Sequence, residues 1–272
     1  MFQTKPKVVY VNHMGDDLDI VNDARISFSK MSTPLSTTSV EVPLHCNAVS
    51  KMDTAQVPSL HKNDVSLIKF LARGCTSKDW SKYLRELVTH EDINAVESLL
   101  SYLRNMPTHW TPFGHQSMKF RVSAPVPIRT QCFKHKIGMV ENEESRRYIR
   151  STPEIFLPDY RLAPEGSIKQ GSGGPHPDNA YWQEQYRKQA ESSLNLYLQQ
   201  IEAGVAPEQA RFSLPQGAVV NWVWTGSLYA FAEFYNKRSD RSHAQQEVAD
   251  IADQIGIVGN ALFPVAWSAL TE

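Results

Sequence analysis

Apolar and polar residues alternate or recur at helical spacing along most of the chain, and this pattern predicts both strands and helices. Residues 7–14, KVVYVNHM, alternate in the manner of a strand. Residues 15–28 begin with acidic capping residues and carry apolar side chains three apart, which predicts a helix. Residues 32–61 are rich in Ser, Thr, Pro and Val without a helical period, so we expect an irregular excursion with room for a hairpin.

Three amphipathic helices are predicted next. Residues 63–74 have the pattern of a capped helix that ends at Gly74. Residues 77–87 and 92–106 each carry apolar residues three and four apart. The segment after them, residues 108–117, contains a proline and a glycine that break the pattern, which predicts a shaped loop.

The rest of the chain is predicted to alternate strands with longer helices. A strand is expected over residues 118–128, ended by two prolines, and residues 128–136 fit one helical run. The later segments are a polar loop over residues 164–179, a long helix over 179–203, a helix starting at Pro207, a strand followed by a helix over 217–235, and a helical region from His243 with a break at Pro264. Because no repeat or linker divides the chain, we predict one α+β domain over residues 1–272, with a mixed or antiparallel sheet packed by long helices.

Composition narrows the class of protein. Hydrophobic residues make up 41% of the 272 residues and aromatic residues 10%, which is enough for a large core. A formal net charge of −1 argues against a protein that coats nucleic acid or an anionic membrane. The cysteines, Cys46, Cys75 and Cys132, are odd in number and widely spaced, so neither a disulfide framework nor a Cys-x-x-Cys metal site is indicated. A reducing, cytoplasmic setting is expected.

Neither a membrane span nor a metal site is expected. The longest apolar stretch, residues 217–235, is interrupted by Asn221 and Glu233, whereas a membrane-spanning helix needs about 20 mostly apolar residues. The histidines lack the Glu-flanked i, i+4 pattern of a zinc-binding helix. Trp222 and Trp224 alternate along the predicted strand, which is typical of a core or a subunit interface.

Residues 134–148, KHKIGMVENEESRRY, hold two lysines, a histidine, three glutamates, a serine and two arginines. On a helix, Gln131 would share a face with the lysine and histidine that open this stretch, and in a turn or helix Asn142 would share a face with Ser145. Such a cluster offers charged hydrogen bonds to a phosphate, each worth roughly 1.5–3 kcal/mol. The alternative is a solvated face of salt bridges worth about 0–1 kcal/mol each, and spacing alone does not decide between them.

This stretch resembles the signature of the flavin-dependent thymidylate synthases, which reads Arg-His-Arg, a short spacer, then Asn-Glu-x-Ser-x-Arg-Tyr. Here the two halves read KHK (residues 134–136) and NEESRRY (residues 142–148). Lysine replaces both arginines of the first half, which keeps the charge but loses the bidentate fork, and the spacer is one residue longer.

Four more segments are similar to the family in the same order: residues 11–28, HWTPFGH (109–115), ARFSLPQG (210–217) and FYNKRSDRSHAQQE (234–247). Gly114 stands where the family has glutamate, and the last segment contains one added residue. The likeness is weak or expanded over about residues 32–104 and 152–205. These expansions suggest a viral variant, which would act in the host cytoplasm.

The resemblance implies an α+β subunit that forms a homotetramer with active sites shared between subunits. It also implies methyl transfer to C5 of dUMP, with 5,10-methylenetetrahydrofolate as the carbon donor and NADPH-reduced FAD as the hydride source. The residues that would surround dUMP are Gln131, Lys134, Glu143, Ser145, Arg146, Arg147, Arg211 and Arg238. Those that would contact FAD are His109, Thr111, His135, Lys136, Ile137 and Asn142, with Ser227, Tyr229 and Glu233 at positions where the family has Asn, Arg and Asn.

By the same resemblance, the expected catalytic residues are Arg238, Ser145 and His109. Arg238 matches the arginine that polarises the uracil ring, although the added residue leaves Arg241 as an alternative. Ser145 has no His/Asp partner at a recognisable spacing, so we expect it to hydrogen-bond rather than to attack. Cys132 is expected to pack in the core rather than to serve as a nucleophile.

Two other functions stay open at this point. Gly114 and the altered flavin positions also fit a relative that hydroxymethylates or methylates another pyrimidine deoxynucleotide. A nucleic-acid-binding module could place Lys134, Lys136, Arg146 and Arg147 on phosphates. The near-neutral charge and the lack of aromatic residues among those cations weigh against that module, and no nucleic-acid partner is expected.

Overall fold

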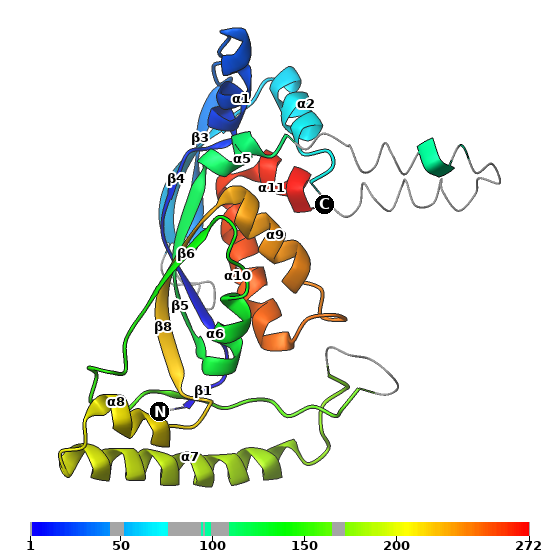
Figure 1. Cartoon of the computed structure of the whole chain (residues 1–272). Helices are drawn as coiled ribbons and strands as arrows, with labels where there is room; N and C mark the ends of the chain where they lie inside the picture. Colours follow the sequence, from blue (N-terminus) through cyan, green and yellow to red (C-terminus); the bar gives the residue numbers. More distant parts are fainter. Residues whose placement is uncertain are drawn as a thin grey trace.

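A four-stranded antiparallel sheet lies at the centre of the fold (Figure 1), in a computed structural model that describes residues 2–43, 52–75, 94, 96–98, 109–164 and 172–271. The strand order is β2-β5-β8-β6. The strands are β2 (Lys7–Met14), β5 (Ser117–Pro125), β8 (Val219–Ser227) and β6 (Met139–Glu143). β5 and β8 pair along their whole lengths, whereas β6 is a short edge strand.

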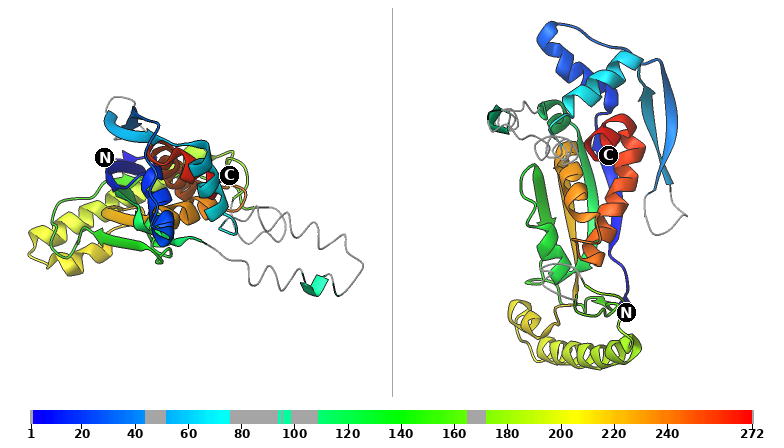
Figure 2. Two further views of the ribbon diagram at one scale, coloured as in Figure 1. Left: turned by 90° about the horizontal axis from the view of Figure 1, so that it is seen from above. Right: turned by 90° about the vertical axis from the view of Figure 1, so that its right-hand side faces the viewer.

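Three helices cover one face of this sheet, as Figures 1 and 2 show. They are α9 (Leu228–Arg238), α10 (Gln246–Leu262) and α11 (Pro264–Thr271). The Trp224 ring on β8 packs edge-on against Phe234 of α9, with ring centroids 5.0 Å apart. Trp222 and Trp224, predicted to lie in a core or a subunit interface, are 2% and 0% exposed and lie in the core.

One end of the sheet carries the N-terminal helices. α1 (Asp17–Arg25) begins with a capping box, and η1 (Ile26–Phe28) continues it; α2 (Lys62–Leu71) lies nearby. The buried Asp17 carboxylate accepts hydrogen bonds from the first backbone N–H groups of α11, at Val265 (2.8 Å) and Ala266 (3.0 Å). These bonds satisfy donors that a helix start leaves free, and so they fix α11 to α1.

The opposite end of the sheet is closed by α7 (Asn179–Glu202), which runs across the strand ends in Figure 1. Two short helices, α8 (Pro207–Ala210) and η2 (Arg211–Ser213), return the chain from α7 to β8. The fully buried Tyr197 of α7 donates a hydrogen bond from Oη to the Ile149 carbonyl at 3.0 Å. A small parallel pair, β1 (Phe2–Gln3) and β7 (Ile155–Phe156), lies beside it. The first residues of β8 therefore lie near η2 and the segment after β6.

The predicted α+β class with an antiparallel sheet is confirmed. The predicted strand over residues 7–14, the helix over 179–203 and the strand and helix over 217–235 are all present. The predicted helices over residues 77–87 and 92–106 lie outside the described residues, apart from residues 94 and 96–98.

Several boundaries were predicted wrongly. Residues 32–61 contain a regular antiparallel pair, β3 (Ser36–Pro43) and β4 (Met52–Ser59), so the pairing of a hairpin that the sequence left room for is present, whereas the irregular chain expected around it is less extensive. The loop over residues 108–117 contains a short helix, α5 (Thr111–His115). The single helical run over residues 128–136 is also wrong, because α6 (Val126–Cys132) starts at the prolines and ends earlier.

Candidate functional site

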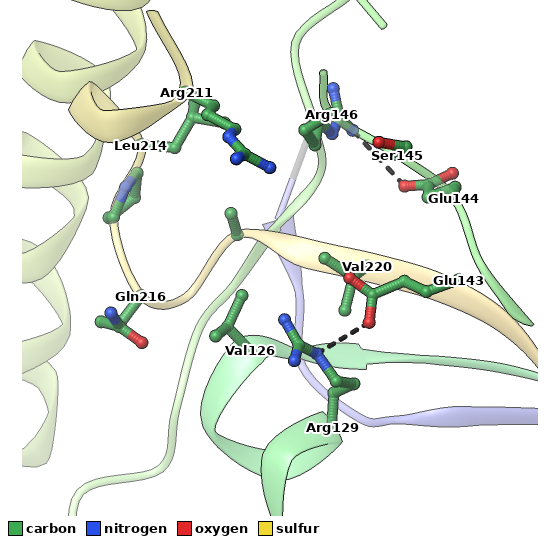
Figure 3. Close-up of a pocket in the computed structure, with 12 residues that line it drawn as sticks. Val126, Arg129, Glu143, Glu144, Ser145, Arg146, Arg211, Leu214, Gln216 and Val220 are labelled. Atoms are coloured by element: carbon green, nitrogen blue, oxygen red, sulfur yellow. Dashed lines mark ion pairs between the residues drawn. The ribbon is translucent and has the colours of Figure 1, made fainter. Parts of the chain in front are cut away.

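A pocket of about 380 Å³ opens where α6, the segment after β6 and the chain before β8 meet (Figure 3). Its lining brings together four predicted site residues, Glu143, Ser145, Arg146 and Arg211, from separate parts of the chain. The other lining residues are Val126, Arg129, Glu144, Leu214, Pro215, Gln216, Ala218 and Val220. The sequence therefore predicted four of the six charged and hydroxyl-bearing residues in this lining.

Three arginines reach this pocket from three segments. Arg129 comes from α6, Arg146 from the turn after β6, and Arg211 from η2; Figure 3 shows Arg211 and Arg146 on opposite sides. Arg146 Nη1 donates to the Ser151 carbonyl at 2.5 Å, and Arg211 Nε donates to the Glu208 carbonyl at 3.2 Å. These backbone contacts hold both guanidinium groups at the pocket.

Two carboxylates accompany the arginines. Arg129 Nε lies 2.8 Å from Glu143 Oε2, whereas Arg146 Nη2 lies 3.7 Å from Glu144 Oε1, too far for a hydrogen bond. Arg129 Nε, Arg146 Nε and Glu144 Oε1 are buried and make no hydrogen bond within the described part of the chain, so the contact between Arg129 and Glu143 is an ion pair without hydrogen-bond geometry. A buried polar group without a partner costs roughly 1–3 kcal/mol, so a polar ligand that supplied partners would be favoured.

The charges of these five groups suit an anion that also carries neutral donors. Arg129, Arg146 and Arg211 outnumber Glu143 and Glu144 by one positive charge. Guanidinium groups bind phosphate oxygens in pairs, and carboxylates accept hydrogen bonds from hydroxyl or ring N–H groups. A nucleoside monophosphate offers both kinds of partner.

The second half of the motif is a strand end followed by a turn, so the face that Asn142 and Ser145 were predicted to share in a turn or helix is wrong. Asn142 and Glu143 are the last residues of β6, where successive side chains point to opposite faces of the sheet. Asn142 therefore points away from the face on which Glu143 meets Arg129. Ser145 begins the turn, and its Oγ accepts a hydrogen bond from the Arg147 N–H at 3.4 Å. Asn142 and Ser145 do not share a face.

Four residues predicted to surround dUMP are not part of this pocket's described lining. Gln131 Nε2 donates to Gln245 Oε1 at 2.5 Å, and Lys134 is exposed just after α6. Arg147 lies on the surface, with its Nε 3.7 Å from Glu208 Oε2. Arg238, at the end of α9, makes its contact with His135 instead.

His135 and Arg238 form a second polar contact. Arg238 Nε donates to His135 Nε2 at 3.0 Å, and the His135 ring packs edge-on against Phe234. Burial, and then the charges of Arg238 and Lys237, lower the pKa of His135 to about 4. The alternative arginine, Arg241, is held by Asp250 (2.8 Å) and Asp253 (2.7 Å). Of the two candidate arginines, Arg238 therefore contacts a neutral side chain, whereas Arg241 is paired with carboxylates.

Residues predicted to contact FAD gather around the start of α9. The Gly138 carbonyl accepts from Ser227 N–H at 3.0 Å, which fixes the loop after α6 there, and Ser227 Oγ accepts from Ala230 N–H as the α9 cap. Ile137, in that loop, is 92% exposed. The Tyr229 ring lies 5.7 Å from the Trp110 ring.

Next to Trp110, the His109 ring stacks on Phe70 with centroids 5.9 Å apart. Thr111 follows as the exposed first residue of α5. The charged members of the set are both paired: Lys136 forms an ion pair with Glu141, and Glu233 lies 2.8 Å from Lys237 Nζ. The exposed part of this surface therefore combines the aromatic and aliphatic side chains of Phe70, Trp110 and Ile137 with polar ones such as the paired Lys136.

Position 114 lies against the Trp110 ring, which limits the size of the side chain there. A Cβ atom built on Gly114 would lie 3.0 Å from the Trp110 ring, so a larger side chain requires that ring to move. The departure at Gly114 is therefore coupled to the aromatic pair of Trp110 and Tyr229.

Cys132 is fully buried in the core cluster, as predicted for a packing residue. Burial raises the pKa of its thiol to about 12, although Arg238 opposes the shift. A nucleophile must be a thiolate, so this cysteine is poorly suited to attack a substrate.

Arg129 and Glu144 were missed by the sequence reasoning. Glu144 lies inside the motif but at one of its variable positions, and Arg129 lies outside the motif. The signal that could have found Arg129 is electrostatic, because a largely buried Glu143 requires a cation nearby. No helix in the described ranges combines the length and the apolar character that crossing a bilayer requires.

The chain is similar to known proteins over most of its length. Residues 57–265 match the family described as thymidylate synthase complementing protein. A flavin-dependent thymidylate synthase of Thermosipho africanus is 31% identical over 172 residues, which cover 60% of this chain and 72% of that relative. Another, of Thermotoga neapolitana, is 29% identical over 226 residues, which cover 80% of this chain and 94% of the relative.

A solved structure shares the fold. The crystal structure of a UMP/dUMP methylase, PolB from Streptomyces cacaoi bound with 5-Br dUMP, matches with a TM-score of 0.69. The match covers 99% of this chain and 96% of that chain at 23% sequence identity. At this level of identity, the likeness is one of architecture.

Proposed function

Because this chain belongs to the thymidylate synthase complementing protein family, as its motifs predicted, we propose that it is a flavin-dependent thymidylate synthase that converts dUMP to dTMP. The relatives named above carry that activity in their names. The proposal includes FAD as the cofactor, NADPH and 5,10-methylenetetrahydrofolate as co-substrates, a homotetramer, and a cytoplasmic location.

The observation that carries the proposal is the pocket between Arg146 and Arg211. Its size suits a nucleotide rather than a macromolecule, and its charges suit a phosphate beside neutral donors. Arg146 and Arg211 would hold the phosphate of dUMP. Ser145 would donate its hydroxyl to the same group, and Glu143 would accept hydrogen bonds from the sugar or the uracil ring.

The side chains around the start of α9 are of the chemical types that bind a flavin. Ile137, Trp110 and Phe70 are exposed apolar side chains beside the polar groups of His109, Lys136 and Tyr229. A planar, largely apolar ring system with polar edges is the ligand that such a surface prefers. Bound FAD would supply the hydride that completes the methyl group.

Arg238 would activate the uracil ring. Its guanidinium would stabilise the negative charge that develops on the ring when C5 attacks the one-carbon unit. The neutral His135 orients this guanidinium through the 3.0 Å hydrogen bond. Because the described lining of the dUMP pocket lacks Arg238, Gln131 and Lys134, we propose that these residues complete the pocket of a neighbouring subunit in the tetramer.

Two measurements test this function. The purified protein should bind FAD and show a flavin absorption band; a protein that remains colourless with FAD and binds oligonucleotides would favour the nucleic-acid module. Incubation with NADPH, methylenetetrahydrofolate and dUMP should then give dTMP, identified by mass. A hydroxymethylated product, or turnover only of dCMP or UMP, would contradict the proposal and favour a related pyrimidine-modifying enzyme.

A further inference from the structure

Arg129 and Glu143 form an ion pair on one side of the pocket that the family signature does not contain. Arg129 stands on α6, and Glu143 ends β6, so the pair joins two separate elements (Figure 3). Both side chains are about three-quarters buried, at 26% and 25% exposed. The Arg129 guanidinium also lies over the Phe133 ring, 5.4 Å from its centroid, which limits its movement.

Glu143 is the carboxylate in this pocket that most needs a cation. Burial raises its pKa, and the neighbouring Glu144 raises it further, while Arg129 opposes both effects. The other charged groups at the pocket are Arg146, from the turn after β6, and Arg211, from η2. Arg146 is closest to Glu144, and Arg211 is held through the Glu208 carbonyl. Arg129 is therefore the described cation that directly pairs with Glu143.

A nucleotide phosphate enters this pocket beside two carboxylates. If Arg129 were absent, the charges of Arg146 and Arg211 would only balance those of Glu143 and Glu144. Glu143 would have no cation directly beside it, and its charge would repel the phosphate. Glu143 would then be protonated more readily, and a protonated carboxyl offers one fewer acceptor to a sugar hydroxyl or a ring N–H.

We propose that Arg129 is a positioning residue for the pyrimidine nucleotide: it holds the Glu143 carboxylate in place as an acceptor for the neutral donors of the nucleoside, while Arg146 and Arg211 take the phosphate. This inference rests on the proposed function, because it assigns one more residue to the same site. Arg129 acts through Glu143 and need not touch the nucleotide.

The test is equilibrium binding of dUMP, measured by calorimetry on the full chain, for the wild type, Arg129→Gln and Arg129→Lys. We expect Arg129→Gln to weaken binding about 10- to 100-fold, because Glu143 loses the cation that holds its buried carboxylate charged and in place. Arg129→Lys, which keeps the charge, should recover most of the affinity. Lys188→Gln is the matched control, because it removes an exposed cation that is paired with Glu184 on α7. Circular dichroism and thermal unfolding confirm that each variant is folded.

Two further readouts separate positioning from a merely structural role. The affinity of the wild type for dUMP should fall at acidic pH as Glu143 takes up a proton, and in Arg129→Gln this fall should start at higher pH. The titration of the dUMP phosphate is common to all variants, so it does not produce that difference. In a Glu143→Gln background, Arg129→Gln should change the affinity by less than about threefold, because a residue that acts through Glu143 has no effect once Glu143 is gone.

The outcomes are distinct. The inference would be overturned if the Arg129→Gln variant bound dUMP as tightly as the wild type does. It would also be overturned if the substitution weakened binding equally with Glu143 and with Gln at position 143, and left the pH profile unchanged. Either result would leave the proposed function standing. A wild-type protein that binds no dUMP at all would contradict the proposed function itself.

Discussion

Arg238 Nε donates a hydrogen bond to His135 Nε2 across 3.0 Å, which joins the end of α9 to the first half of the charged motif. Because Nε2 accepts this bond, the imidazole carries its proton on Nδ1 and is neutral. Its pKa of about 4 agrees with that protonation state. The histidine in the middle of the motif is thus a neutral partner that orients an arginine, not one more cation for a phosphate.

The lowered pKa of His135 predicts a pH-dependent stability. Between about pH 6.5 and pH 4, the unfolded chain binds a proton at this residue and the folded protein does not. Its contribution to the free energy of unfolding is therefore present above about pH 6.5 and is lost as the pH falls toward 4. Thermal unfolding between pH 4.5 and 7 should show a steeper loss on acidification for the wild type than for His135→Asn. Equal slopes would show that His135 is not held neutral.

Arg238 and Arg241 are expected to differ in their effect on turnover. Arg238→Ala should lower kcat about 100-fold or more, as the removal of a group that stabilises developing charge does. Arg241 is bound by Asp250 and Asp253, so Arg241→Ala should leave kcat within about threefold. Steady-state dTMP formation measures both. The reverse ranking would assign ring activation to Arg241.

Cys132→Ala should retain activity. The thiol is fully buried and its pKa is raised to about 12, so it is not the thiolate that attack requires. The substitution removes one buried atom, and the expected cost is about 1 kcal/mol in the free energy of unfolding, measured with urea. A folded Cys132→Ala protein without turnover would mean that this cysteine takes part in the chemistry.

The strands and helices that the sequence predicted well are those with a long, regular pattern. β2 alternates over its whole length, and the buried β8 runs directly into α9. α6 has only seven residues, too few for periodicity to fix its end, so Lys134 and His135 were placed on a helix that stops at Cys132. β6 reads MVENE, a polar segment that becomes a strand only by pairing with β8.

The site was predictable as a set of residues but not as an arrangement. The resemblance over residues 134–148 led to Glu143, Ser145 and Arg146, and that over a distant segment led to Arg211; the fold brings these four to one pocket. The pairing of Glu143 with Arg129 arises because β6 folds back beside β8, and no spacing rule along the chain encodes that contact. Which residues a neighbouring subunit contributes also depends on assembly rather than on local pattern.

Arg211 is expected to contribute to phosphate binding. Arg211→Ala should weaken the affinity for dUMP about tenfold at low salt, since it removes one charged hydrogen bond from an exposed side chain. The loss should shrink as the salt concentration rises, because salt screens exposed charges. Arg187→Ala is the control, since that guanidinium lies 4.7 Å from the centroid of the Phe2 ring and is not among the residues that line the pocket. Equal affinities for Arg211→Ala and the control would remove Arg211 from the site.

A crystal structure of the protein with dUMP and FAD tests the whole account most directly. We predict that the dUMP phosphate lies within hydrogen-bond distance of Arg146 and Arg211, with the flavin against the surface formed by Ile137 and Trp110. A nucleotide bound elsewhere on the chain, with the pocket between Arg146 and Arg211 open to solvent, would contradict it.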